Sequence, residues 1–176
     1  MRLEDLGWDE AFARQFDAIG QMADVQPGRV AIEFNHIYRV STEQLGELEA
    51  TLAGRLKHRA ASRSELPAVG DWVAVRKRGT ENRGAIVAVL PRRSRFSRRM
   101  AGHVTDEQVV AANIDTLFIV MGLDPDFNLR RLERYLLLAR ESGAAPAILL
   151  TKPDLCDNVA ARRAEVAALA GDVPVH

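Results

Sequence analysis

The sequence predicts a mixed fold, in which a five-stranded β-barrel of the oligonucleotide-binding type is followed by part of an α/β domain. Short β-like runs between turn residues fill the chain from residue 28 to 90. From residue 116 onward, apolar strands alternate with a helix. Basic residues are in excess only in the first of these regions. We therefore expect a docking helix at 1–27, the barrel at 28–99 and the α/β domain at 100–176.

The N-terminal segment predicts a short amphipathic helix. Phe12, Phe16 and Ile19 recur at the spacing that places side chains on one helical face. Pro27-Gly28 is typical of a segment end. We expect the apolar face to dock on the barrel.

Five β-like runs predict the barrel. They are Arg29–Phe34, Ile37–Val40, Leu48–Leu56, Trp72–Arg76 and Gly84–Leu90. The third run also allows a helix through its leucines, but apolar residues at every second position favour a strand. Closing such a sheet removes its exposed edges while its loops stay free to follow a nucleic-acid backbone.

The charged residues are distributed unevenly behind a formal net charge of zero. Residues 1–28 carry two basic and six acidic residues (−4), residues 29–99 carry fifteen and seven (+8), and residues 100–176 carry seven and eleven (−4). Most of the basic residues are Arg, whose planar guanidinium binds phosphate oxygens in pairs. The barrel region therefore predicts RNA binding.

Two basic runs supply the candidate RNA-binding residues. These are Arg55, Lys57 and Arg59 in the first run, and Arg92, Arg93, Arg95, Phe96, Arg98 and Arg99 in the second. Each neutralised phosphate releases counterions, and Phe96 would stack on an unpaired base for about 1 to 3 kcal/mol. Two other interpretations stay open. The second run is a solvated linker between domains, or the arginines cover the surface of a purely structural protein.

The C-terminal part predicts a right-handed parallel crossover. Thr116–Val120 and Pro146–Leu150 are apolar strands, and Leu129–Arg140 is helical between them. A further helix is expected at 158–170, followed by the start of a third strand at 173–176.

Thr151, Lys152 and Asp154 are the candidate guanine-binding residues, in the loop after the second of these strands. Open α/β sheets bind ligands at the carboxyl ends of their strands. The carboxylate of Asp154 would accept hydrogen bonds from both N1–H and the 2-amino group of guanine. The stem of Lys152 would lie across the base, and its position before Pro153 predicts an extended backbone.

Sequence signals for other kinds of site are few in these 176 residues. No Gly-x-x-x-x-Gly-Lys-Ser/Thr phosphate loop occurs. Cys156 is the only cysteine and the four histidines are scattered, so we expect neither a disulfide nor a metal site. No membrane-spanning run or cleavable leader is visible, and a cytoplasmic protein is expected.

Several longer motifs resemble the ribosome small-subunit-dependent GTPase family, and the similarity covers nearly the whole chain. They are Leu6–Trp8, Gly70–Val73, Leu90–Ser94, Glu107–Thr116, Asp126–Tyr135 and Thr151–Asp154. The resemblance implies a circularly permuted, P-loop-type GTPase domain, whose guanine motif precedes the phosphate loop, and then a zinc-binding C-terminal domain. It also implies GTP or GDP with Mg²⁺ as ligands and a role in late maturation of the small ribosomal subunit.

The resulting hypothesis is the N-terminal part of such a GTPase, which contacts the small subunit and its rRNA through the barrel. The family usually has Asn where Thr151 stands. The resemblance transfers no phosphate-binding, magnesium-binding or zinc-binding residue to 1–176, so we assign no catalytic residue and expect this chain alone to be inactive. The α/β sheet is also expected to keep an unpaired apolar edge. The alternative is a non-enzymatic RNA-binding module with an interaction domain.

Overall fold

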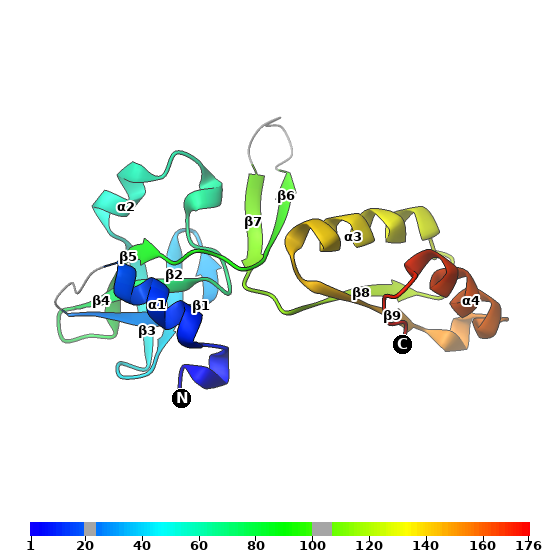
Figure 1. Cartoon of the computed structure of the whole chain (residues 1–176), viewed down its shortest axis with the longest axis horizontal. Helices are drawn as coiled ribbons and strands as arrows, with labels where there is room; N and C mark the ends of the chain where they lie inside the picture. The colour runs from blue at the N-terminus through cyan, green and yellow to red at the C-terminus, as the bar shows by residue number, and fades with distance from the viewer. Residues whose placement is uncertain (20–23, 100–106) are drawn as a thin grey trace. The chain divides into compact units, whose positions relative to one another are not determined.

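The computed structural model describes residues 1–19, 24–99 and 107–176 (Figure 1). The chain divides into two compact units, Met1–Asn113 and Ile114–His176, and each is treated by itself below. Among the described residues, no helix combines the length and the apolar character that crossing a membrane requires.

The predicted N-terminal helix is present as α1 (Glu10–Ala18), after a single 3-10 turn, η1 (Glu4–Leu6). Asp9 caps α1 by accepting hydrogen bonds from the backbone amides of Ala11 and Phe12. Phe12 is buried against Trp72, and Trp8 meets the same indole edge-on with 4.7 Å between ring centroids. Burial of these aromatic rings fixes α1 on the barrel.

The predicted five-stranded barrel is confirmed. Its strands are β1 (Val25–Phe34), β2 (Ile37–Thr42), β3 (Glu47–Leu52), β4 (Trp72–Arg78) and β5 (Arg83–Val89). The closed order is β1-β2-β3-β5-β4, with β3 and β5 parallel and all other pairs antiparallel. The interior is filled by fully buried side chains, among them Val30, Tyr38, Val40 and Leu48. Burial raises the pKa of Tyr38 to about 12.

Two sequence expectations for this unit need correction. β1 begins at Val25, so Pro27 and Gly28 lie inside a strand that pairs with β4 and do not end a segment. The third run is a strand only as far as Leu52, and Gly54–Arg59 forms a short helix, α2. The amide of Ala53 still donates to Ile86 of β5, after which the chain leaves the sheet and Leu56 packs on the core from the helix.

The arginine-rich run forms a strand, which corrects the open interpretation of a linker. β6 (Arg95–Arg99) pairs antiparallel with β7 (Glu107–Ala112). The amide of Ala112 also donates to Val69, and that of Asn113 to Ser94. These bonds extend the first compact unit beyond residue 99, where the sequence placed its boundary. The functional division into 1–27, 28–99 and 100–176 stays a prediction.

The C-terminal unit has the predicted strand, helix and strand. Its elements are β8 (Thr116–Gly122), α3 (Leu129–Ser142), β9 (Ala145–Thr151), the 3-10 turn η3 (Pro153–Leu155) and α4 (Val159–Ala170). β8 and β9 are parallel, and backbone bonds from β9 to Pro174 and His176 start the expected third strand. Both helices pack on the sheet face that carries Ile119 and Ile148.

Candidate guanine-nucleotide and RNA-binding sites

The candidate guanine corner lies where β8 and β9 end side by side. Gly122 and Thr151 are partners in the parallel ladder, and the amide of Leu123 donates to the carbonyl of Thr151 at 2.8 Å. The Thr151 hydroxyl faces the carbonyl of Met121 at 3.5 Å, a weak contact within the sheet. The two strand-end loops are therefore tied together at their origin.

Lys152 has a left-handed backbone, with φ 58° and ψ 46°, where its position before Pro153 predicted an extended one. The chain reverses sharply here, because η3 begins at Pro153 and the amide of Leu155 donates back to the carbonyl of Lys152. This conformation is unfavourable for a residue with a Cβ atom, and such strain concentrates at functional sites.

The ammonium of Lys152 forms an ion pair with Asp124, in the loop after β8. The hydrogen bond from Lys152 is the main cause that holds the pKa of Asp124 below its usual value, and the same bond raises the pKa of Lys152. Sequence reasoning missed Asp124. Its signal is a carboxylate just past the end of the strand that neighbours the motif-bearing one.

The carboxylate of Asp154 is exposed within η3, two residues after Lys152. A purine base can therefore reach it. A pocket of about 500 Å³ adjoins the corner, between the loop after β8 and the start of α4. Asp124 lines this pocket, whereas Lys152 and Asp154 do not.

The first basic run lies on the surface of the barrel. Arg55, Lys57 and Arg59 are all exposed on α2, while Leu56 between them faces the core. Beside α2 is a pocket of about 620 Å³ whose lining includes Lys57 and His36.

Arg92 of the second run has a structural role. Its guanidinium binds both carboxylate oxygens of Asp71, at 2.8 and 2.7 Å, and donates to the carbonyls of Ser64 and Leu66. The Asp71 side chain is 0% exposed and that of Arg92 is 13% exposed. A buried bidentate pair of this kind leaves Arg92 no free face for phosphate.

Arg93 also has a structural role, because it forms an ion pair with Asp9 and lies over the ring of Phe12 at 3.9 Å. Arg95 is exposed and Phe96 is half-buried. The predicted RNA contacts of Arg98 and Arg99 concern side chains outside the described part of the structure.

Sequence reasoning missed an aromatic group at the turn between β1 and β2. Phe34 is 69% exposed and Ile37 is 43% exposed, on either side of the tight Asn35-His36 turn. The available signal was an aromatic residue at a strand end directly before a turn. In barrels of this topology, the face of strands 2 and 3 and the adjoining loops bind oligonucleotides.

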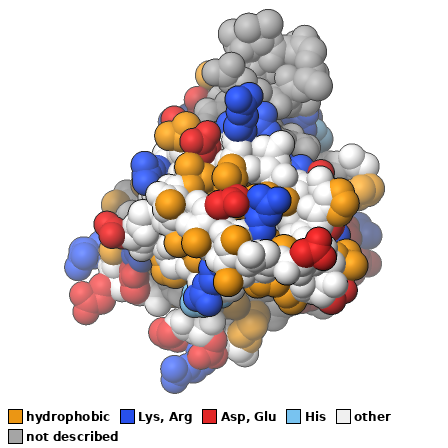
Figure 2. All heavy atoms as spheres, turned by 90° about the vertical axis from the view of Figure 1, so that its right-hand side faces the viewer, with side chains coloured by type: hydrophobic (Ala, Val, Ile, Leu, Met, Phe, Trp, Pro, Cys, Tyr) orange, Lys and Arg blue, Asp and Glu red, His pale blue; other side chains and the backbone are white. Residues whose placement is uncertain are grey.

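The exposed surface of the α/β unit differs from that of the barrel unit in its distribution of charge. Figure 2, in which the right-hand side of Figure 1 faces the viewer, shows acidic and basic side chains intermingled with hydrophobic ones. No patch of a single charge dominates this view.

Comparisons with known proteins agree with this geometry. The family model described as RsgA GTPase matches residues 89–175. "Small ribosomal subunit biogenesis GTPase RsgA" of Opitutus terrae is 48% identical, over 99% of this chain and 49% of that protein. The corresponding RsgA 1 of Listeria innocua is 44% identical, over 100% of this chain and 47% of that protein. The chain thus spans about half the length of the curated relatives it matches.

Two solved structures share the fold. YjeQ of Thermotoga maritima aligns with a TM-score of 0.63 at 21% identity, covering 86% of this chain and 50% of that one. YloQ, described as a circularly permuted GTPase, aligns with a TM-score of 0.59 at 19% identity, covering 89% and 52%. This similarity shows the fold alone, whereas the relatives at 48% and 44% identity, together with the family model, show that the chain belongs to the RsgA GTPase family.

Proposed function

We propose that this chain forms the RNA-binding barrel and the guanine-reading corner of a GTPase that acts in biogenesis of the small ribosomal subunit. The observation that carries the proposal is the exposed Asp154 carboxylate beside Lys152, at the carboxyl end of β9, in a chain of the RsgA GTPase family. The printed names of the relatives support the small subunit as the partner. A cytoplasmic site of action follows from that partner.

Guanine recognition follows from the chemistry of the corner. One carboxylate accepts two hydrogen bonds from guanine, whereas adenine offers an acceptor at N1 and no 2-amino group. A bidentate contact of this kind discriminates by about 1 to 3 kcal/mol, or roughly tenfold to a hundredfold. Thr151 contributes through the backbone, since its carbonyl ties the two strand-end loops together and its hydroxyl faces β8.

Hydrolysis requires groups that residues 1–176 do not encode. Phosphoryl transfer depends on a phosphate-binding loop and on Mg²⁺, which would neutralise the charge on the phosphates, and residues 1–176 contain no such loop. The 176-residue polypeptide therefore binds GTP weakly and does not hydrolyse it. Mg²⁺, and the zinc that the family resemblance implies, would be held by residues other than these.

The RNA surface that we propose centres on α2 and the neighbouring turn. Arg55, Lys57 and Arg59 supply positive charge, and Phe34 supplies an exposed ring on which an unpaired base can stack. Arg95 is a further candidate, and Phe96 and the last two arginines of β6 stay in the proposal. Arg92 and Arg93 are left out because their guanidinium groups hold the fold together.

The guanine proposal is tested by titrating the isotopically labelled 176-residue chain with GMP, AMP and XMP while amide signals of 151–158 are followed by NMR. We expect GMP to bind weakly but preferentially. Asp154→Asn should reverse the preference in favour of XMP, because an amide accepts from N1–H and donates to the 2-oxo group of xanthine. Asp157→Asn removes a nearby exposed carboxylate as a matched control. Unchanged base preference in Asp154→Asn would contradict the proposal.

The RNA proposal is tested with small ribosomal subunits at several salt concentrations. Changing Arg55, Lys57 and Arg59 together to Gln should lower affinity by about tenfold, and should reduce the salt dependence by roughly two ions released. The same change at the exposed residues Arg76, Lys77 and Arg78 removes equal charge from the end of β4. Equal losses in the two triple variants would show that net charge, and not this surface, determines binding.

A further inference from the structure

We propose that Asp124 is a positioning residue for guanine recognition: from the loop after β8, it fixes Lys152 with its methylene stem presented to the base before nucleotide arrives. This inference rests on the proposed guanine site. It assigns a role to a residue outside the four-residue motif. The surface on which the base would lie, the stem of Lys152, is then positioned by two loops, one after β8 and one after β9.

Asp124 is itself held firmly. Its side chain is 12% exposed, and its Oδ1 accepts a hydrogen bond from the amide of Asp126 at 3.0 Å. Its carbonyl accepts from the amide of Phe127 at 2.9 Å. A Cβ atom at Gly122 would come within 3.0 Å of Asp124 Oδ2, so the glycine leaves room for the carboxylate. The carboxylate therefore offers a fixed point for a flexible partner.

Lys152 is held at both ends of its side chain. The backbone is set by the left-handed turn that precedes η3, and the ammonium is set by Asp124. With the ammonium paired, the side chain is still 55% exposed. The exposed portion thus includes the apolar stem, which is the part that a base face can cover. Asp154 is close enough to contribute to the raised pKa of Lys152.

A fixed lysine binds better than a mobile one. A free Lys side chain samples many rotamers, and a ligand that packs on it must restrict them. An ion pair formed within the protein makes that restriction before binding, which lowers the entropic cost of association. An ion pair that instead competed with the nucleotide for the ammonium would give the opposite result, because loss of Asp124 would then strengthen binding.

The test uses the 176-residue chain and GMP, with affinities from NMR titration of Asp124→Asn, Lys152→Met and the double variant. We expect Asp124→Asn to weaken GMP binding by about fivefold and to leave the GMP-to-XMP preference unchanged, since Asp154 still reads the base. Lys152→Met should weaken binding at least as much. The double variant should bind no more weakly than Lys152→Met alone, because Asp124 acts through the lysine.

Asp126→Asn is the matched control. It makes the same charge change two residues away in the same loop, and the Asp126 side chain is 80% exposed and paired with Arg131. We expect its GMP affinity to stay within about twofold of wild type. Tighter binding in Asp124→Asn, or an equal loss in Asp126→Asn, would overturn the positioning role while leaving guanine recognition by Asp154 intact.

A second measurement does not depend on nucleotide. The chain contains three lysines, Lys57, Lys77 and Lys152, so their side-chain Nζ signals can be assigned from single Lys variants. We expect the Lys152 Nζ–H signal to be protected from exchange in wild type and in Asp126→Asn, and to lose protection in Asp124→Asn. Protection that survives in Asp124→Asn would overturn the inference. Absence of any GMP binding by wild type would overturn both the guanine site and the inference built on it.

Discussion

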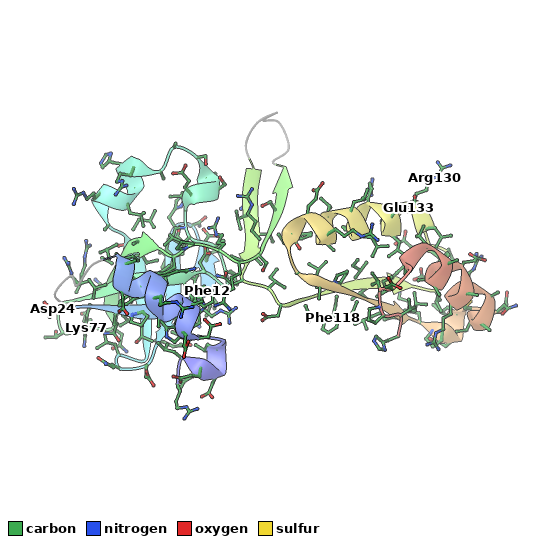
Figure 3. All side chains as sticks on the ribbon, in the orientation of Figure 1. Phe12, Asp24, Lys77, Phe118, Arg130 and Glu133 are labelled. Carbon is green, nitrogen blue, oxygen red and sulfur yellow. The ribbon has the colours of Figure 1, made fainter. Side chains whose placement is uncertain are left out.

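The barrel and the α/β sheet differ in whether their edge strands are paired. β1 pairs with both β2 and β4, so the barrel has no free edge and encloses its core from all sides. β8 pairs only with β9 among the described strands, and Phe118 and Val120 are each 62% exposed. Figure 3 shows Phe118 on the side of β8 away from α3. The barrel therefore has a closed sheet, whereas in the described part of the α/β unit the helices cover one face of the sheet only.

The two units also use charged residues differently. In the barrel unit, Arg92 binds the carboxylate of Asp71, and Arg93 binds that of Asp9 and lies over the ring of Phe12. Arg29 donates to the carbonyls of Leu6, Gly70 and Asn113. In the α/β unit, Lys152 and Asp154 are exposed at the end of β9, and Lys152 keeps more than half of its side chain exposed although its ammonium is paired with Asp124. A cluster of arginines in the sequence is thus compatible with a structural role, while the position of a charge at a strand end is the better indicator of a site.

The largest effect that separates the units should come from the buried pair of Asp71 and Arg92. Arg92→Met leaves the Asp71 carboxylate buried without its partner, which costs about 3 to 5 kcal/mol of the free energy of unfolding. Urea denaturation followed by tryptophan fluorescence measures this directly, because Trp8 and Trp72 both belong to the barrel unit. Arg95→Met, at an exposed position of the same run, should cost less than about 1 kcal/mol. Equal costs would remove the structural distinction within the run.

A second test concerns the close approach between the barrel and the hairpin of β6 and β7. Gly70 has φ +87°, and a Cβ atom there would overlap the carbonyl oxygen of Ala112. Gly79 has φ +65° and open space around it. Gly79→Ala should cost about 1 to 2 kcal/mol from backbone strain alone. Gly70→Ala should cost a further 1 to 3 kcal/mol, roughly, from the clash. The same fluorescence-detected unfolding measures both, and equal costs would show that the hairpin does not need this contact.

The sheet face that carries Phe118 and Val120, beside the unpaired edge of β8, predicts a smaller effect, on association. Unpaired strand edges with apolar side chains favour pairing between chains. We expect the 176-residue chain to self-associate reversibly in sedimentation experiments, and Phe118→Ser with Val120→Thr to raise the dissociation constant by about tenfold. Leu137→Ser removes a similarly exposed apolar group from α3 as a control. A chain that stays monomeric at high concentration would show that this surface does not drive self-association.

Local sequence patterns predicted what local forces determine. The spacing of apolar residues located β8, α3 and β9 to within two residues, because each element buries one regular face against the same core. The same reasoning failed at residues 54–56, where alternation continues past Leu52 but the ladder with β5 ends there. It also failed for β6. This strand forms because it pairs with β7, and an arginine-rich run has no alternation of apolar residues from which that pairing could be predicted.

The site shows the same limit. The position of Thr151–Asp154 at a strand end could be predicted because the residues are contiguous and follow an apolar strand, and their role in binding guanine stays a prediction. The ion pair between Asp124 and Lys152 could not be predicted, since it spans 28 positions and exists only through the parallel pairing of two strands. Likewise, no sequence pattern assigns Arg92 to Asp71, 21 positions away, in preference to RNA.

The smallest effect that we expect is a dependence of barrel-unit stability on pH, arising at Asp9. The hydrogen bond from Arg93 is the main cause that lowers the pKa of Asp9 from 3.8 to about 2, and the capped amides of α1 act in the same direction. A carboxyl whose pKa is lower in the folded state stabilises the fold fully above its unfolded pKa. That stabilisation is then lost as the pH falls from about 4 to about 2.

Asp9→Asn isolates this contribution, because an amide still caps the helix but carries no charge for Arg93. The difference in unfolding free energy between wild type and this variant should be constant above pH 4 and should shrink toward pH 2. Asp17→Asn makes the same charge change at the other end of α1 and should leave a wild-type pH profile. If Asp9→Asn retained that profile, the contact between Arg93 and α1 would not be formed in solution, and Arg93 would return to the set of arginines available to RNA.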